Sequence, residues 1–200
     1  MHEHFTFPPP RPTTQAAEGL PRWRWTVAEV ERLATHGFFT DFDQFELLGG
    51  EIVPMVSPAG RRHETIRIEL AHHWAQLAGK NLLVAQEPQF NLSPDTFVKP
   101  DILVHLRAIK TYDLKGSEAL LVVEVAETSL SYDLKIKLPI YASHGVREYW
   151  VINAITRMTM VHRQPAGNAC TDREELRSTE RLVPSLAPAL AVSLNELDLD

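Results

Sequence analysis

Two acidic residues lie in or beside apolar stretches that are expected to form buried strands. Glu124 interrupts the apolar run 119–126, and Asp101 stands directly before the apolar run 102–104. Burying a carboxylate costs several kcal/mol, roughly, unless it is paired or binds a cation. Neighbouring strands that each carry one acid would bring the two carboxylates together. Because Mg2+ is bound through a few carboxylates with water and phosphate oxygens, Asp101 and Glu124 are candidate metal ligands.

These two acids also have a purely structural interpretation. Asp101 would then cap the end of a strand, and Glu124 would bond to a buried arginine or lysine. Metal ligation instead requires that the strands pair as neighbours, so that both acids reach the same end of the sheet. Spacing alone leaves the two interpretations open.

The segment after the second acid favours a catalytic site. Asp133, Lys137 and Tyr141 recur every four residues, so they share one face of the helix expected over 133–143. A lysine on that face could stabilise the charge on a phosphate under attack or position the attacking water. The alternative is an exposed Asp133–Lys137 pair, worth only a few tenths of a kcal/mol, roughly. Lys135 points about 160° away on an ideal helix.

Periodicity and turn signals predict a chain of mixed helices and strands. Thr26 is a good N-cap with Glu29 in the capping-box position, and Gly49-Gly50 marks a hairpin turn. We expect helices over 27–35, 63–79 and 133–143, a hairpin over 45–55, and strands over 82–92, 101–106, 120–126, 148–152 and 157–162. The charged stretch 172–181 is expected to be a solvated loop or a hairpin face.

Bulk composition limits the class of protein. The chain has 200 residues, a formal net charge of −6 and one cysteine, which fits one domain in a reducing cytoplasm. The proline-rich residues 1–22 are expected to be a flexible arm and 23–200 a single domain. No run approaches the roughly 18 apolar residues of a membrane span. The acidic balance argues against a general nucleic-acid binder, so any DNA contact needs a local basic patch.

The motifs, taken together, resemble a known family. Pro100-Asp101, the strand around Glu124, the Asp133/Lys137/Tyr141 spacing and the string Gly-Val-Arg-Glu-Tyr-Trp at 145–150 are similar to the Uma2 family, described as putative restriction endonucleases. That family belongs to the PD-(D/E)xK nuclease superfamily. The resemblance extends over about residues 25 to 195, and it includes the entry segment 50–58 followed by His63.

The resemblance implies a fold and a set of site residues. It implies an α/β (α+β) restriction-endonuclease-like core, with a mixed central sheet flanked by helices in the order αβββαβ, after an N-terminal β-ribbon. It implies Asp101 and Glu124 as ligands of Mg2+ (or Mn2+), with the Val125 carbonyl as a candidate third. Where the superfamily pattern has Glu-x-Lys, this chain has Ala126, and Lys137 is the expected substitute.

Further residues are candidates for supporting roles. These are Glu51, His63 and Asp133, with Glu64 and Glu69 as alternative acids on the preceding helix. Glu51 could equally bond backbone groups of the hairpin, and His63 could be only a helix-start residue.

The activity implied by the resemblance is Mg2+-dependent endonucleolytic hydrolysis of phosphodiester bonds in DNA. The alternatives are a catalytically silent binding or assembly module with the same fold, and a metal hydrolase acting on RNA or a nucleotide. DNA is the expected partner, and a homodimer is expected because cutting both strands of a duplex usually takes two active sites.

Overall fold

The computed structural model describes residues 23–39, 44–55 and 60–199. These residues divide into two compact units. The first comprises 23–39, 44–55 and 94–96, and the second comprises 60–93 and 97–199. The expected arm over 1–22 lies outside the described residues, and the single domain over 23–200 stays a prediction. Within the described part of the chain, no helix is long and apolar enough to cross a membrane.

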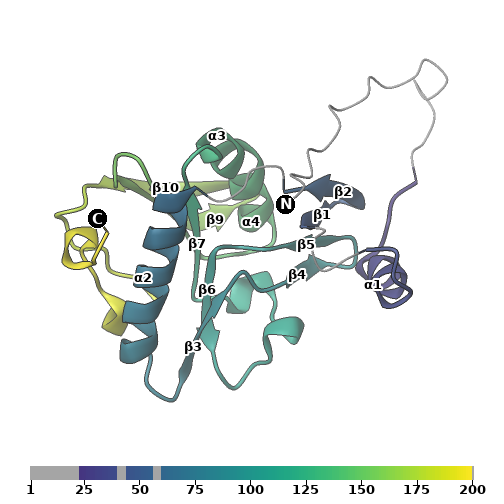
Figure 1. Ribbon diagram of the computed structural model, residues 1–200, viewed down its shortest axis with the longest axis horizontal. Helices are drawn as coiled ribbons and strands as arrows, with labels where there is room; N and C mark the ends of the chain where they lie inside the picture. Colours follow the sequence, from purple (N-terminus) through teal and green to yellow (C-terminus); the bar gives the residue numbers. More distant parts are fainter. Residues whose placement is uncertain (1–22, 40–43, 56–59, 200) are drawn as a thin grey trace, which may run out of the picture. The chain divides into compact units, whose positions relative to one another are not determined.

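The first unit contains one helix and one hairpin (Figure 1). Helix α1 (Val27–Thr35) begins with the predicted capping box, in which the Thr26 side chain accepts from the Glu29 amide and the Glu29 carboxylate accepts from the Thr26 amide. Strands β1 (Phe45–Leu48) and β2 (Glu51–Pro54) pair antiparallel around the predicted glycine turn. Gly50 has a φ of 82°, a left-handed conformation that glycine adopts without steric cost.

The second unit is built on a six-stranded mixed sheet with the strand order β10-β9-β8-β7-β6-β3. Strands β7 and β8 are parallel, and every other neighbouring pair is antiparallel. The strands are β3 (Leu82–Gln86), β6 (Ile102–Leu106), β7 (Leu121–Ala126), β8 (Glu148–Asn153), β9 (Thr159–Ala166) and β10 (Ala169–Leu176). This arrangement confirms the expected mixed α/β fold.

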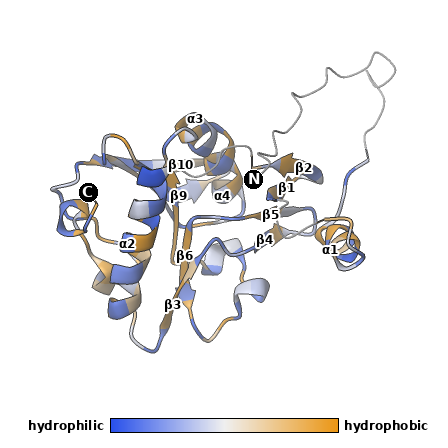
Figure 2. Cartoon of the chain, in the orientation of Figure 1, coloured by the Kyte–Doolittle hydropathy of each residue, from blue (hydrophilic) through white to orange (hydrophobic). Residues whose placement is uncertain are grey.

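Helix α2 (Arg61–Leu77) covers one face of this sheet (Figure 1). Its apolar side chains pack with alternate residues of the central strands and with the C-terminal segment from residue 182 onward. The buried helix residues are Ile66, Leu70, Ala71 and Trp74. In Figure 2 the strand β6 is orange, whereas α2 carries both blue and orange turns, as expected for a helix with one buried face.

The opposite face of the sheet carries α4 (Leu138–Ser143). Its Tyr141 packs on Tyr149 of β8 with ring centroids 4.8 Å apart, and Tyr149 in turn stacks on His162 of β9 at 6.2 Å. Side chains alternate along a strand, so Glu124 points to this face while Val123 and Val125 join the core against α2.

One expectation about the strands needs correction. The predicted strand over 82–92 is two strands, β3 and β4 (Phe90–Ser93), and a further strand β5 (Thr96–Val98) follows. The break falls at Glu87, whose φ is 47°, followed by Pro88, which has no N–H for the ladder. The first part of the charged stretch 172–181 belongs to β10, which forms a hairpin with β9, in agreement with the hairpin face expected there. Short connecting turns lie at 111–113, 116–118, 188–190 and 194–196.

Glu148 ties the C-terminal segment to the sheet. This carboxylate is 1% exposed. Its Oε1 accepts from Trp150 Nε1 at 2.8 Å and from Arg163 Nε at 3.0 Å, and its Oε2 accepts from the Ser185 amide at 2.7 Å. The glutamate of the Gly-Val-Arg-Glu-Tyr-Trp string is therefore a structural anchor.

We expect Glu148→Ala to lower the free energy of unfolding by about 3 kcal/mol, because it leaves a buried indole N–H and part of a guanidinium without their acceptor. Glu175→Ala, which removes an exposed carboxylate paired with Arg173, should change it by less than about 0.5 kcal/mol. Urea unfolding of both variants measures the difference. Equal effects would mean that Glu148 is not an anchor.

His162 links stability to pH. Burial lowers the pKa of His162 from its ordinary value of 6.5, Arg173 lowers it further, and the charge of Glu175 only partly opposes them. The unfolded chain therefore takes up this proton at a higher pH than the folded protein does. The contribution of His162 to stability is complete above about pH 6.5, and it is lost as the pH falls below that value.

We therefore expect His162→Gln to flatten the dependence of the melting temperature on pH. Between pH 7.5 and 5.5 the wild type should lose more stability than the variant, because the variant has no imidazole to protonate on unfolding. Thermal melts at both pH values give the comparison. A wild-type loss equal to the loss in the variant would contradict the assignment.

Candidate active site

Pairing of β6 and β7 brings the two predicted acids together. The antiparallel register pairs Ile102 with Val123, so Asp101 and Glu124 occupy the next pair of positions. Asp101 is 8% exposed, and its Oδ2 accepts from the Val125 amide at 2.7 Å. The expectation that the two acid-bearing strands are neighbours is confirmed.

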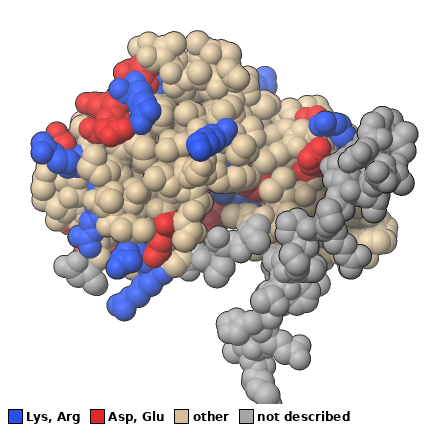
Figure 3. Space-filling view, turned by 90° about the horizontal axis from the view of Figure 1, so that it is seen from above, with Lys and Arg blue, Asp and Glu red and all other residues tan. Residues whose placement is uncertain are grey.

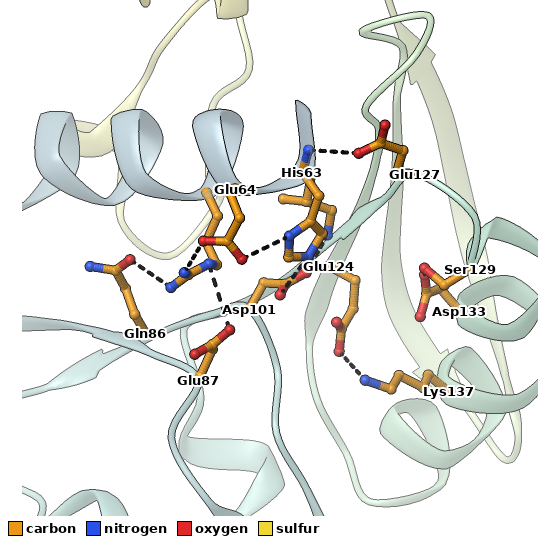
Figure 4. Close-up of polar contacts among 12 residues, drawn as sticks. His63, Glu64, Gln86, Glu87, Asp101, Glu124, Glu127, Ser129, Asp133 and Lys137 are labelled. Atoms are coloured by element: carbon orange, nitrogen blue, oxygen red, sulfur yellow. Dashed lines mark hydrogen bonds and ion pairs between the residues drawn. The ribbon is translucent and has the colours of Figure 1, made fainter. Parts of the chain in front are cut away.

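Glu124 is held by two donors from the helical segment that follows, and Figure 4 shows the first of them, Lys137. Its Oε1 accepts from Lys137 Nζ at 2.9 Å and from Tyr141 Oη at 2.8 Å. Glu124 and Lys137 are each 4% exposed. A buried carboxylate needs such compensation, because leaving the charge unpaired costs several kcal/mol, roughly. The structural interpretation expected a buried basic partner for Glu124, and the catalytic interpretation expected Lys137 near the acids. Lys137 meets both expectations.

The segment that carries Lys137 is not the regular helix expected over 133–143. It consists of a short α-helix, α3 (Leu130–Tyr132), a π-helical turn at Asp133–Lys137, and α4. The Leu138 amide bonds to the Asp133 carbonyl, five residues back. Pro139 follows this turn, and a proline lacks the N–H of a regular helix while its ring crowds the carbonyl four residues earlier. The wider turn is thus a consequence of Pro139.

Asp133 lies inside the fold. It is 3% exposed, its Oδ2 accepts from Ser129 Oγ at 2.6 Å, and its carbonyl accepts from Tyr149 Oη at 3.3 Å. Because both Asp133 and Lys137 are buried, the exposed surface pair that the spacing also allowed is wrong.

His63 links α2 to Asp101. Its Nε2 lies 2.9 Å from Asp101 Oδ1, and its Nδ1 lies 3.5 Å from Glu64 Oε1. Burial by itself lowers the pKa of His63, but the hydrogen bond to Asp101 and the charges of Asp101 and Glu64 outweigh it, so the pKa is raised above 6.5. When protonated, this imidazole offsets the charge of Asp101. His63 therefore contacts a candidate metal ligand as well as being a residue of the first helical turn.

Glu127 closes the N-terminus of α2. Its Oε2 accepts from the His63 amide at 3.1 Å (Figure 4), and it supplies the cap that Gly60 lacks a side chain to provide. A Cβ at Gly60 would displace the end of the Glu127 side chain, so glycine permits this close approach. The sequence signal for Glu127 is its place directly after a buried strand.

Arg67 forms a second polar group beside Asp101 that sequence reasoning did not foresee. Its Nη1 donates to Gln86 Oε1 at 3.0 Å, its Nη2 bonds to Glu64 Oε2, and its Nε lies 3.7 Å from Glu87 Oε1. The Glu87 amide donates to the Asp101 carbonyl at 3.2 Å. The arginine thus connects α2 to the chain segment next to Asp101. In the sequence, the spacing of three between Glu64 and Arg67 indicates only that they share one helix face.

Glu51, the remaining candidate, belongs to the first unit. It lies on β2, where its Oε1 is 4.0 Å from Arg24 Nη2. Its carboxylate is more than half exposed. Its supporting role therefore stays a prediction.

The donor set suits a cation bound with few protein ligands. Among the described residues, no cluster of three or more His, Cys, Asp or Glu side chains could hold a metal ion. Two carboxylates from adjacent strands, Asp101 and Glu124, remain. Mg2+ is commonly held by one or two carboxylates, with waters and substrate phosphates completing an octahedral shell. The site is consistent with that mode of binding and not with an all-protein metal cage.

Basic side chains near the start of α2 are accessible. Arg61 and Arg62 are exposed, although Arg62 Nη1 lies 3.8 Å from Glu127 Oε1. Figure 3 shows Lys and Arg side chains mainly along the left and lower left of the visible face, next to acidic ones, with further basic side chains near the middle and at the right, and tan surface over most of the view.

Comparisons with known proteins agree with this fold. A structural match is the crystal structure of a putative nuclease belonging to DUF820 from Anabaena variabilis ATCC 29413, with a TM-score of 0.69, 20% sequence identity, and coverage of 88% of this chain and 97% of that chain. No curated protein matches the sequence. The model of the Uma2 family, described as "Putative restriction endonuclease", matches residues 27–196. The chain therefore belongs to the Uma2 family.

Proposed function

We propose that this protein is a divalent-metal-dependent endonuclease that hydrolyses phosphodiester bonds in DNA. The observation that supports it best is the group formed by Asp101, Glu124 and Lys137, in which a buried lysine from a helix reaches an acid on the central sheet at 2.9 Å. Membership of a family described as "Putative restriction endonuclease" supports the same class of reaction.

Asp101 and Glu124 would hold the metal ion, Mg2+ or Mn2+. When bound, such an ion polarises the scissile phosphate and lowers the pKa of a bound water. Hydrogen bonds within the protein already hold the carboxylates of Asp101 and Glu124 in place. The Val125 amide and His63 fix the two oxygens of Asp101, and donors from the helical segment fix Oε1 of Glu124. Preorganised ligands need not be reoriented when the substrate arrives.

Lys137 would stabilise the negative charge that develops on the phosphate. The position after Val125, where the superfamily has its lysine, is Ala126, which is 1% exposed and carries no charge. Lys137 would take the place of the missing strand lysine. It lies on the π-helical turn and not on β7, and its ammonium group contacts the Glu124 carboxylate. A cation placed at the phosphate before reaction is worth several kcal/mol of barrier, roughly.

DNA binding would depend on few contacts. The exposed Arg61 and Arg62 lie at the start of α2, two residues or fewer from His63. Cutting both strands of a duplex usually takes two active sites, so we propose that the protein acts on duplex DNA as a homodimer.

Replacing Asp101 tests the metal site. Asp101→Asn keeps an oxygen to accept from the Val125 amide but removes the charge, so we expect a folded protein whose affinity for Mn2+ falls by at least tenfold, roughly. Titration calorimetry measures the affinity, and nicking of supercoiled plasmid with Mg2+ or Mn2+ measures activity. Unchanged Mn2+ affinity in the folded variant would exclude Asp101 as a ligand. A wild type that binds metal but cleaves no DNA would favour a silent binding module.

Two lysines on the same segment provide a matched test of the electrostatic role. Lys137→Met should lower the rate of plasmid cleavage about a hundredfold, the equivalent of losing an electrostatic contact worth ~3 kcal/mol. Lys135 is exposed, and Lys135→Met should leave the rate within about twofold, because a solvated charge away from the phosphate adds little. Similar rates for the two variants would refute the assignment of Lys137.

A further inference from the structure

Tyr141 is one of the two donors that contact Glu124, and it differs from Lys137 in carrying a hydroxyl group. Its side chain is fully buried, at 0% exposed. Its hydroxyl lies 2.8 Å from Glu124 Oε1, the same oxygen that Lys137 contacts at 2.9 Å. One carboxylate oxygen therefore bears two donors that come from one helical segment, four residues apart.

The tyrosine ring is itself rigidly placed. It packs on Tyr149 of β8 at 4.8 Å between centroids, and the Tyr149 hydroxyl donates to the Asp133 carbonyl at 3.3 Å. That carbonyl also accepts from the Leu138 amide in the π-helical turn. The aromatic pair therefore positions both the Tyr141 hydroxyl and the turn that carries Lys137.

The two donors to Glu124, Lys137 and Tyr141, have different roles when a substrate phosphate is bound. Lys137 must turn its ammonium group toward a phosphate to stabilise its charge, and this weakens the contact with Glu124. Tyr141 presents a hydroxyl group in place of an ammonium group, so a phosphate attracts it far less than it attracts the lysine. A hydrogen bond from a buried phenol can therefore persist on Glu124 while the lysine serves the substrate.

We propose that Tyr141 is a positioning residue, which holds Glu124 Oε1 so that Glu124 keeps its metal-binding orientation while Lys137 moves to the substrate phosphate. This inference rests on the proposed function, because it assumes that Glu124 binds the metal ion. Residues that orient a metal ligand from behind contribute strongly to metal affinity, and their loss typically weakens it 10- to 100-fold, roughly.

The test is Tyr141→Phe, with Tyr149→Phe as the matched control. Both changes remove one buried phenol hydroxyl from the same aromatic pair, but only the first removes a donor to Glu124. Titration calorimetry with Mn2+ on the full chain should show affinity about tenfold weaker in Tyr141→Phe and a clearly smaller loss in Tyr149→Phe, which keeps the donor to Glu124. In plasmid cleavage at saturating Mn2+, Tyr141→Phe should lower kcat and leave KM for DNA within twofold.

A second arm separates positioning from general stability. In a Lys137→Met background, Tyr141→Phe removes the other donor to Oε1 as well, so its effect on Mn2+ affinity should be larger than in the wild type. Equal Mn2+ affinities of Tyr141→Phe and wild type, or equal losses in the two phenylalanine variants, would overturn the proposal while leaving the proposed function intact. A wild type that binds no Mn2+ would overturn both.

Discussion

The structure of the site depends on one constraint, which is that the carboxylate of Glu124 is buried in the central sheet and must be compensated. Water cannot do so at 4% exposure, and leaving the charge alone would cost several kcal/mol, roughly. The fold supplies Lys137 and Tyr141 as partners from the helical segment after β7. The buried Glu124 carboxylate is therefore stable only when the segment after β7 folds so that Lys137 and Tyr141 reach it.

The strand pairing explains why the second acid joins the first. Since β6 and β7 are antiparallel neighbours, Asp101 meets the backbone of β7 at Val125 and turns its other oxygen to His63. The parallel pairing of β7 with β8 requires a crossover connection, and this crossover is the segment that carries Lys137. The mixed sheet is thus what allows a sheet acid and a helix lysine to approach each other.

The helix α2 serves both stability and the site. Its buried face contributes to the main core, while its first turn presents His63 to Asp101 and receives a cap from Glu127. Packing of the apolar face holds the helix in place, and the polar first turn is positioned as a result. Gly60 permits this arrangement because a Cβ there would displace the end of the Glu127 side chain.

The sequence by itself determined the mixed α/β class, the capped helix α1, the glycine hairpin and the candidate residues Asp101, Glu124 and Lys137, because burial patterns and turn chemistry are local signals. Only the tertiary structure decided the break at Glu87 and the π-helical turn before Pro139. It also decided which partners meet, as with Glu127 on the first turn of α2. Local periodicity contains no information on which distant backbone or carboxylate a side chain will meet, and that depends on strand order and register.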